Sequence, residues 1–171
     1  MEHTTITLLS LGSNVGDRIA NLREAVLRLR ALGEVLAVSA LYETEPMELT
    51  TQPWFLNCTV KLETTLSPEQ LLHAALAIEE SMGRRRVVAK GPRAIDIDML
   101  LYGDAVIDTP ALTVPHPALA ERRFVLAPLA EIAEDFRHPL LHRTMRELLL
   151  ALPAYAGEVR IHMASGWINL S

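Results

Sequence analysis

The sequence predicts an α+β domain in which strands and helices alternate along the chain. Residues 56–63 alternate apolar and polar side chains without a break, which is the pattern of a half-buried strand. One face of an amphipathic helix is indicated by apolar residues at steps of three and four, namely Ile19, Leu22, Val26 and Leu29. Apolar residues make up 50% of the 171 residues, so the chain can bury a substantial core.

Further strands are indicated by short apolar or β-branched runs that end at glycine or at turn residues. One such run ends at Gly12, and Gly103 and Asp104 form a turn after another. The predicted strands cover residues 6–11, 35–42, 56–63 and 94–102, with a short return strand at 106–107.

Two helices have recognisable ends. We expect the first to stop at Gly33. Ser67, Pro68 and Gln70 supply a cap, a proline at the first helical position and a capping-box partner. The second helix is therefore predicted to begin there and to run to about Met82.

The part of the chain after residue 108 is rich in proline, which predicts turns and short helices there. The prolines concerned are Pro110, Pro115, Pro117 and Pro128. A last helix is expected over residues 144–150, and residues 159–163 are a candidate strand.

The first six elements follow the order β-α-β-β-α-β. This is the split βαβ, or ferredoxin-like, arrangement, an antiparallel sheet with helices on one face. An α-rich C-terminal extension follows it. We expect a single domain over residues 1–171, with its core at about 5–150 and a less determined tail at 154–171. Because this fold supports many functions, it identifies none.

Charge and cysteine content exclude several classes of protein. The formal net charge of −5 argues against a protein that binds nucleic acid. Cys58 is the one cysteine, so no internal disulfide can form, and we expect it to be an inert core residue. No signal-peptide pattern is visible, and no apolar run approaches the roughly 18 residues that span a bilayer. We expect a cytoplasmic protein without a membrane partner, for which a monomer is compatible with the sequence.

The sharpest local signal is the pair Asp96 and Asp98. Residues two apart on a strand point to the same face, so the two carboxylates project together while Ile95, Ile97 and Met99 face the core. Paired carboxylates repel each other unless a cation lies between them, and hard oxygen ligands suit Mg²⁺. The alternative is two acids on a solvated strand face.

Arginines surround this pair in the sequence, and arginine forks bind phosphate oxygens well. Arg84, Arg85 and Arg86 follow the second helix, and Arg93 precedes the acidic strand. A triple arginine alone is more often a solvated loop. Beside a pair of acids that suits a metal ion, it favours a polyphosphate site.

A third group of residues suits a flat heterocycle. Phe55, Asn57 and Thr59 share one face of their strand, opposite Leu56 and Cys58. An aromatic plane beside an amide can stack on such a ring and hydrogen-bond to it. A surface aromatic residue without a ligand explains the pattern equally well.

Together these segments resemble the 6-hydroxymethyl-7,8-dihydropterin pyrophosphokinase family of folate biosynthesis. The resemblance covers about residues 6–150, and the string at 91–98 is highly specific. The family's fold is ferredoxin-like, in agreement with the element order above. The matching residues are 11–14, 42–46, 52–57, 78–79, 83–84, 91–98, 114–117 and 122–124.

The resemblance implies a role for each matching residue. Asp96 and Asp98 are expected to hold two Mg²⁺ ions on the phosphates of ATP, and Arg84 and Arg93 to act on the transferred group. The expected ATP-binding residues are Glu79, Arg84, Arg86, Arg93, Ile95, His116 and Arg122. The expected pterin-binding residues are Thr44, Pro46, Met47, Phe55, Asn57 and Phe124.

The implied reaction is attack of the substrate's hydroxymethyl oxygen on the β-phosphorus of ATP, with release of AMP. Residues 45–52 and 84–92 are the segments expected to close over the site. Two departures from some family members, Lys90 in place of a tryptophan and Ala111 in place of an arginine, bear on closure and ligand affinity.

Two other readings stay open at this point. A Mg²⁺-dependent kinase or nucleotidyltransferase acting on another small alcohol would use the same acids and arginines. A regulatory ligand-binding module with a ferredoxin-like fold would need no metal site at all.

Overall fold

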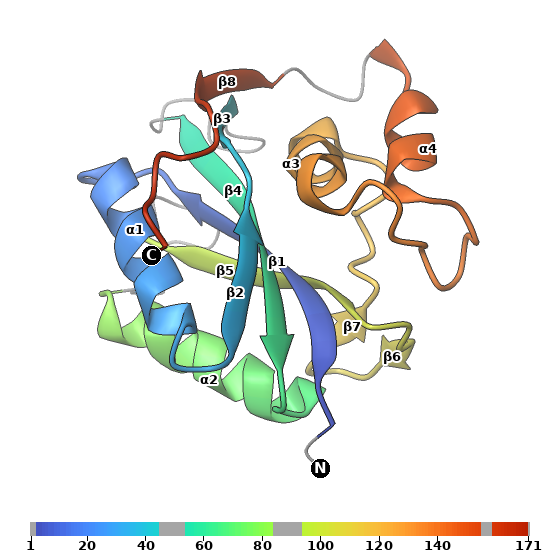
Figure 1. Ribbon diagram of the computed structural model, residues 1–171, viewed down its shortest axis with the longest axis horizontal. Coiled ribbons are helices and arrows are strands. Elements are labelled where there is room, and N and C mark those ends of the chain that lie inside the picture. Colours follow the sequence, from blue (N-terminus) through green and yellow to red (C-terminus); the bar gives the residue numbers. More distant parts are fainter. Residues whose placement is uncertain (1–2, 45–53, 84–93, 155–158, 171) are drawn as a thin grey trace.

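The computed structural model describes residues 3–44, 54–83, 94–154 and 159–170 (Figure 1). The strands are β1 (Thr5–Ser13), β2 (Glu34–Val38), β3 (Leu41–Thr44), β4 (Phe55–Thr64), β5 (Asp96–Tyr102), β6 (Ile107–Asp108), β7 (Thr113–Val114) and β8 (Arg160–Met163). The helices are α1 (Arg18–Leu29), α2 (Pro68–Ser81), α3 (Arg123–Ala133) and α4 (Met145–Leu150).

The main sheet is antiparallel and has the strand order β5-β1-β4-β3-β8, with β2 also paired to β4. Strands β6 and β7 form a separate two-stranded sheet. The first and last strands of the βαββαβ unit, β1 and β5, therefore lie side by side, as in a ferredoxin-like fold. The predicted fold class is confirmed.

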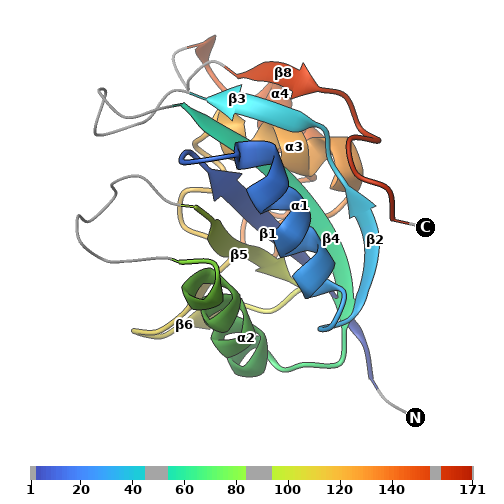
Figure 2. The ribbon, with the colours of Figure 1, turned by 90° about the vertical axis from the view of Figure 1, so that its left-hand side faces the viewer.

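Helices cover both faces of the sheet (Figures 1 and 2). α1 and α2 pack on one face, over a core that includes Leu11, Cys58 and Ile97. The C-terminal extension supplies the second layer, because α3 and α4 pack on the opposite face over Leu8 and Leu100. The prediction of helices on one face concerned the βαββαβ unit, whose two helices, α1 and α2, do lie on the same face.

The helix starts follow from their caps. The side chain of Asp17 accepts a hydrogen bond from the Ala20 backbone N–H at 3.1 Å, at the start of α1. The predicted capping box of α2 is present, since Ser67 and Gln70 each accept from the other's backbone N–H. Each such cap is worth about 1 kcal/mol of helix stability.

The prediction of one continuous strand over residues 35–42 is wrong, because the chain forms two strands, β2 and β3. At the break, the backbone N–H of Thr59 donates to Ser39 Oγ at 2.9 Å instead of to a backbone carbonyl. The next backbone N–H, of Ala40, donates to the carboxylate of Glu131 on α3. The Ser39 N–H still donates to the Thr59 carbonyl at 2.9 Å, so side chains replace only part of the ladder here.

The proline-rich region also differs from the prediction, because it contains the regular eleven-residue helix α3 with Pro128 inside it. An interior proline costs about 3 kcal/mol. The helix nevertheless buries an apolar face, and each large apolar side chain contributes roughly 1.5–3 kcal/mol when buried. Three such side chains, Val125, Leu126 and Leu129, outweigh one missing hydrogen bond.

Three smaller expectations are confirmed. Thr144 caps α4 with a second capping box. The candidate strand at 159–163 is β8, which pairs with β3 at the edge of the sheet. Cys58 is fully buried in the core, and burial raises the pKa of its thiol. Among the described helices, none is long and apolar enough to cross a membrane.

Candidate active site

The acid pair lies on β5, at the end of the strand where it enters the sheet. Asp96 is half-buried and Asp98 is exposed, whereas Ile95, Ile97 and Met99 are 0%, 8% and 7% exposed. The predicted alternation is therefore confirmed, and both carboxylates leave the sheet on the face opposite α1 and α2.

A buried glutamate on α2 holds this part of β5 in place. Glu79 is only 1% exposed, and its Oε2 accepts a hydrogen bond from the backbone N–H of Ile97 at 2.7 Å. Ile97 lies between the two aspartates. Glu79 therefore supports the acid pair through the strand.

One row of the sheet joins the acid pair to the residues expected to bind the heterocycle. Asp96 lies opposite Gly12 on β1, Gly12 lies opposite Asn57 on β4, and Asn57 lies opposite Tyr42 on β3. Adjacent strands are about 4.8 Å apart, so the Cα atoms of Asp96 and Asn57 are separated by about 10 Å. The position between them carries no side chain.

The amide of Asn57 has a fixed orientation. Its Nδ2 donates a hydrogen bond to Thr44 Oγ1 at 2.7 Å, and the side chain is 8% exposed. A Cβ on Gly12 would lie 2.8 Å from Asn57 Oδ1 and 3.4 Å from Phe55 Cδ1. A side chain at position 12 would therefore collide with the Asn57 amide and touch the Phe55 ring, so glycine suits this position.

His116 lies close enough to both Arg122 and Asp96 for its pKa to respond to their charges. Burial and the Arg122 guanidinium lower the pKa of His116, and Asp96 partly opposes this effect. The imidazole is then neutral near pH 7, and its Nδ1 accepts from the backbone N–H of Ala118 at 3.1 Å. The remaining ring nitrogen, Nε2, carries the proton and can donate to a phosphate oxygen.

Arg122 also connects the two groups of predicted ligands. It immediately precedes α3, and its guanidinium lies 5.7 Å from the centre of the Phe124 ring. One residue was expected at ATP and the other at the pterin. Their contact brings one residue of each predicted group together at the start of α3.

Tyr42 and Glu131 are supporting residues that the sequence analysis missed. The Tyr42 hydroxyl donates to Glu131 Oε1 at 2.7 Å, and burial together with that carboxylate raises the pKa of the phenol. This contact fastens α3 to β3, 89 residues away in sequence. No local pattern could have revealed such a pair.

Some predicted site residues lie outside the described part of the chain. They are Pro46, Met47, Arg84, Arg86 and Arg93, together with Lys90 and the two segments expected to close over the site. Of the described residues, Ile95 is fully buried in the core, so only its backbone is available to a ligand, and Ala111 is exposed.

The donor set at the acid pair consists of carboxylate oxygens. Among the described residues, no group of three or more His, Cys, Asp or Glu side chains could hold a metal ion. Zinc or copper sites use such groups, often with nitrogen or sulfur ligands. Two carboxylates fit Mg²⁺, which takes one or two protein oxygens and completes its shell with water and substrate phosphates.

Comparison with known proteins gives a consistent result. The family model described as 7,8-dihydro-6-hydroxymethylpterin-pyrophosphokinase matches residues 8–134. The 2-amino-4-hydroxy-6-hydroxymethyldihydropteridine pyrophosphokinase of Bacillus subtilis is 47% identical over 132 residues, covering 76% of this chain and 79% of that protein. The protein of the same name from Aquifex aeolicus is 42% identical over 139 residues, covering 81% and 87%.

Other relatives are much longer proteins. The folic acid synthesis protein fol1 of Schizosaccharomyces pombe is 46% identical over 151 residues, which cover 87% of this chain and 21% of fol1. The chain thus spans about a fifth of the length of such relatives. The crystal structure of Plasmodium falciparum HPPK-DHPS superimposes with a TM-score of 0.71 at 19% identity, covering 88% of this chain and 44% of that one, and supports the fold.

The family model covers most of the chain, including the acid pair, Asn57, His116 and Arg122. The Bacillus and Aquifex proteins are matched over most of their own length. The chain therefore belongs to the 7,8-dihydro-6-hydroxymethylpterin-pyrophosphokinase family.

Proposed function

We propose that the protein transfers the diphosphoryl group of ATP to the hydroxymethyl group of 6-hydroxymethyl-7,8-dihydropterin and releases AMP, as a step in folate biosynthesis. Membership of the family supports this reaction. The structural observation that carries it is the sheet row from Asp96 across Gly12 to Asn57. It gives a carboxylate end for the metal and phosphates and an amide end for the heterocycle, about 10 Å apart.

The proposed pterin site consists of Asn57, Thr44, Phe55 and Phe124, with Pro46 and Met47 as further contacts. The Asn57 Nδ2 is already bonded to Thr44, which leaves Oδ1 to accept from the N–H groups of the ring. The two phenylalanines offer planes on which the ring stacks. Gly12 leaves room for the hydroxymethyl arm to extend toward β5.

His116 and Arg122 form the described part of the ATP end. Neutral His116 donates from Nε2, and Arg122 offers a fork of N–H groups to phosphate oxygens. The other proposed ATP contacts are Arg84, Arg86, Arg93, Glu79 and the backbone of Ile95. Arg84 and Arg93 stabilise the charge that spreads over the transferred group.

Asp96 and Asp98 would hold Mg²⁺, and two ions are proposed from the family resemblance. When bound, the metal neutralises charge on the phosphates. The protein then has to align the hydroxymethyl oxygen with the β-phosphorus, so that the new P–O bond forms as the bond to AMP breaks. Positioning of this kind supplies much of the rate in phosphoryl transfer.

We also propose that the reaction takes place in the cytoplasm. The buried and unpaired Cys58 is compatible with a reducing compartment. A kinase of another small alcohol would share the acid pair but would not need the Asn57 amide bonded to Thr44 close to Phe55. A regulatory module would bind its ligand without turnover.

The test is AMP release from ATP and Mg²⁺, with and without 6-hydroxymethyl-7,8-dihydropterin. We compare the wild type with Asp98→Asn and with Asp135→Asn, a control acid that is 80% exposed and lies beyond α3. Pterin-dependent AMP release that collapses only in Asp98→Asn supports the proposal. AMP release that needs a different alcohol supports the other kinase, and ligand binding without AMP release supports the regulatory module.

A further inference from the structure

The C-terminal strand β8 lies beyond residues 8–134, the part of the chain that the family model matches. It pairs with β3, placing Arg160 opposite Glu43 and Ile161 opposite Tyr42. β3 is the strand that ends at Thr44, one of the proposed pterin contacts. The tail is therefore built onto the sheet beside the pterin end of the site (Figure 1).

Interactions further along the tail anchor β8. Trp167 is 5% exposed, and its Nε1 donates to the backbone oxygen of Ser39 at 2.8 Å. Arg23 and Arg30 on or next to α1 donate to backbone oxygens of Trp167 and Leu170 at 3.0 and 3.1 Å. The tail is thus fixed on both sides of the turn that follows β8, and it holds a defined position on the sheet.

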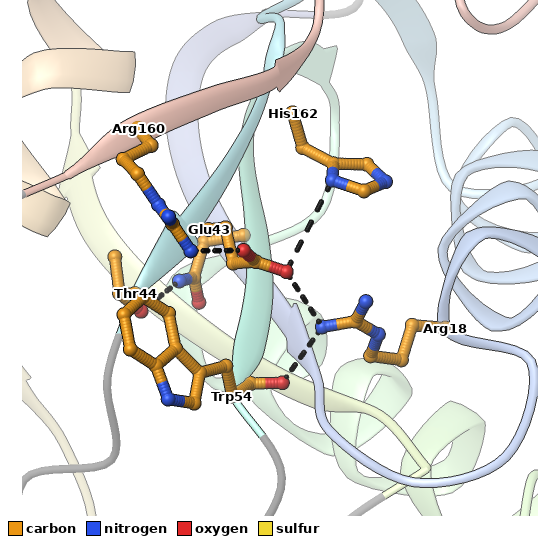
Figure 3. Close-up of polar contacts among 7 residues, drawn as sticks. Arg18, Glu43, Thr44, Trp54, Arg160 and His162 are labelled. Atoms are coloured by element: carbon orange, nitrogen blue, oxygen red, sulfur yellow. Dashed lines mark hydrogen bonds and ion pairs between the residues drawn. The ribbon is translucent and has the colours of Figure 1, made fainter.

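An ionic cluster joins β8 to the edge of the site (Figure 3). The carboxylate of Glu43, whose side chain is 18% exposed, accepts from Arg160 Nη2 at 2.7 Å and from Arg18 Nη1 at 3.3 Å. His162 Nδ1 lies 4.0 Å from the same carboxylate. One carboxylate therefore connects β3 with β8 and with the start of α1.

The same arginines also hold Trp54. Arg18 Nη1 donates to the Trp54 backbone oxygen at 2.9 Å. The guanidinium of Arg160 lies 4.6 Å from the centre of a ring of the Trp54 side chain, a cation–π distance. In Figure 3, Trp54 and Thr44 both lie beside Glu43.

The cluster therefore acts on both segments that carry the pterin contacts. Glu43 immediately precedes Thr44, and Trp54 immediately precedes Phe55. These two segments meet in the β3–β4 ladder, and the hydrogen bond between Asn57 and Thr44 joins their side chains. A shift of one segment relative to the other would change that bond and the direction of the amide.

We propose that Arg160 is a positioning residue for pterin binding, because it fixes the segments bearing Thr44 and Asn57 through Glu43 and Trp54. This inference rests on the proposed function. In this role, Arg160 acts through Glu43 and Trp54 and not by direct contact with a substrate. Its side chain is 64% exposed and contributes little to the stability of the fold, so its removal affects the site more than the folded state.

The experiment measures KM for the dihydropterin, KM for ATP and kcat in wild type, Arg160→Ala and Arg160→Lys. Exposed ion pairs and cation–π contacts are each modest, so we expect Arg160→Ala to raise KM for the pterin about threefold to tenfold. KM for ATP and kcat stay within about twofold, since pterin binding weakens equally in the ground and transition states. Arg160→Lys keeps the charge beside Glu43 and recovers part of the loss.

Arg146→Ala is the matched control. Arg146 is a C-terminal arginine on α4, 52% exposed, with ion pairs to Glu134 and Asp135 away from the site. We expect wild-type constants for it. An unchanged pterin KM in Arg160→Ala overturns the proposal, and so does an equal rise in KM for ATP or an equal effect of Arg146→Ala.

A second measurement separates this inference from the proposed function. The side-chain amide signal of Asn57 and the indole signal of Trp54 can be followed by ¹⁵N NMR without any substrate. If the wild type releases no AMP, the proposed function fails, and movement of both signals in Arg160→Ala alone still supports the positioning role. If neither signal moves, the positioning role is wrong whatever the enzyme does.

Discussion

A methyl group added at Gly12 should damage the pterin site more than the fold. In Gly12→Ala, the new Cβ would lie 2.8 Å from Asn57 Oδ1 and 3.8 Å from the backbone oxygen of Leu56. Ordinary contact begins at 3.4 Å, so the Asn57 amide must move by about 0.6 Å or more. Gly12 has no left-handed φ, so the substitution adds no backbone strain.

The magnitude follows from what that movement breaks. The 2.7 Å hydrogen bond from Asn57 to Thr44 would lengthen or be lost, at about 0.5–1.5 kcal/mol. Overpacking against the amide adds about 1–3 kcal/mol, less whatever the Asn57 side chain relieves by moving. We expect a loss of about 2 kcal/mol in the free energy of unfolding, measured in urea.

The effect on catalysis should be larger. A misplacement of about 1 Å in a positioning group can reduce the rate about 100-fold. We expect kcat/KM for the dihydropterin to fall about 10- to 100-fold, with little change in KM for ATP. AMP release at varied pterin and fixed ATP measures this.

Gly103→Ala is the control. Gly103 has φ of +52°, and its added Cβ would lie 3.0 Å from Thr5 Cγ2, at the end of β5 remote from Asp96. Left-handed backbone costs about 1–2 kcal/mol for alanine, so the stability loss should be similar while pterin kinetics stay at the wild-type level. If Gly12→Ala binds pterin as the wild type does, or if both variants lose activity equally, the role assigned to Gly12 is refuted.

Three further predictions concern the acids and the histidine. Asp98→Asn should lower Mg²⁺-dependent AMP release about 100-fold or more. Its stability in urea should be unchanged, because the side chain is exposed. Activity above about a tenth of wild type would remove Asp98 from the metal site. Glu79→Ala should lower the free energy of unfolding in urea by about 1–3 kcal/mol, because the buried N–H of Ile97 loses its acceptor. Glu79→Gln keeps an acceptor and should lower it less. Equal losses in the two variants would contradict this role. The pKa of His116 is lower in the folded state than in the unfolded state. Once the pH falls below about 6.5, the unfolded state therefore binds more protons than the folded state. The free energy of unfolding then decreases as the pH falls further. His116→Gln should therefore lose less stability than the wild type between pH 7.5 and 5.5, and equal losses would argue against the histidine's contribution.

Local periodicity was sufficient to predict much of the site. A period of two along residues 94–102 placed Asp96 and Asp98 on one face and Ile97 in the core, as the structure has them. The same rule put Phe55 and Asn57 together on β4. The capping box at Ser67 depends on residues three apart and was equally predictable. In each case the relevant neighbours are close in sequence.

The features that sequence analysis missed depend on contacts between distant residues. The break between β2 and β3 arises because Ser39 and Ala40 bond to Thr59 and Glu131, which are 20 and 91 residues away. Ala40 is a weak strand former, but the apolar residues around it still favour one continuous strand. The crowding between Gly12 and Asn57 likewise exists only once β1 and β4 are paired in their register.

The position of the site follows from where the second face of the sheet changes from apolar to polar. Along β1, Leu8 faces α3 and α4, but Ser10 and Gly12, on the same face, lie beyond that apolar cluster. On β5, the register shift opposite Leu8 and Leu9 allows Leu100 and Leu101 both to join the apolar cluster, whereas Asp98 precedes the shift and remains exposed.

One half of this face is thus covered by helices, and the other half presents carboxylates, a glycine and an amide across adjacent strands. Substrates that lie across strands bind residues whose spacing is set by backbone hydrogen bonds, which are more rigid than any loop. The weakest part of such a site is the edge strand, where pairing exists on one side only. β8 closes that edge beside β3, which is why a residue as exposed as Arg160 can influence the geometry at Asn57.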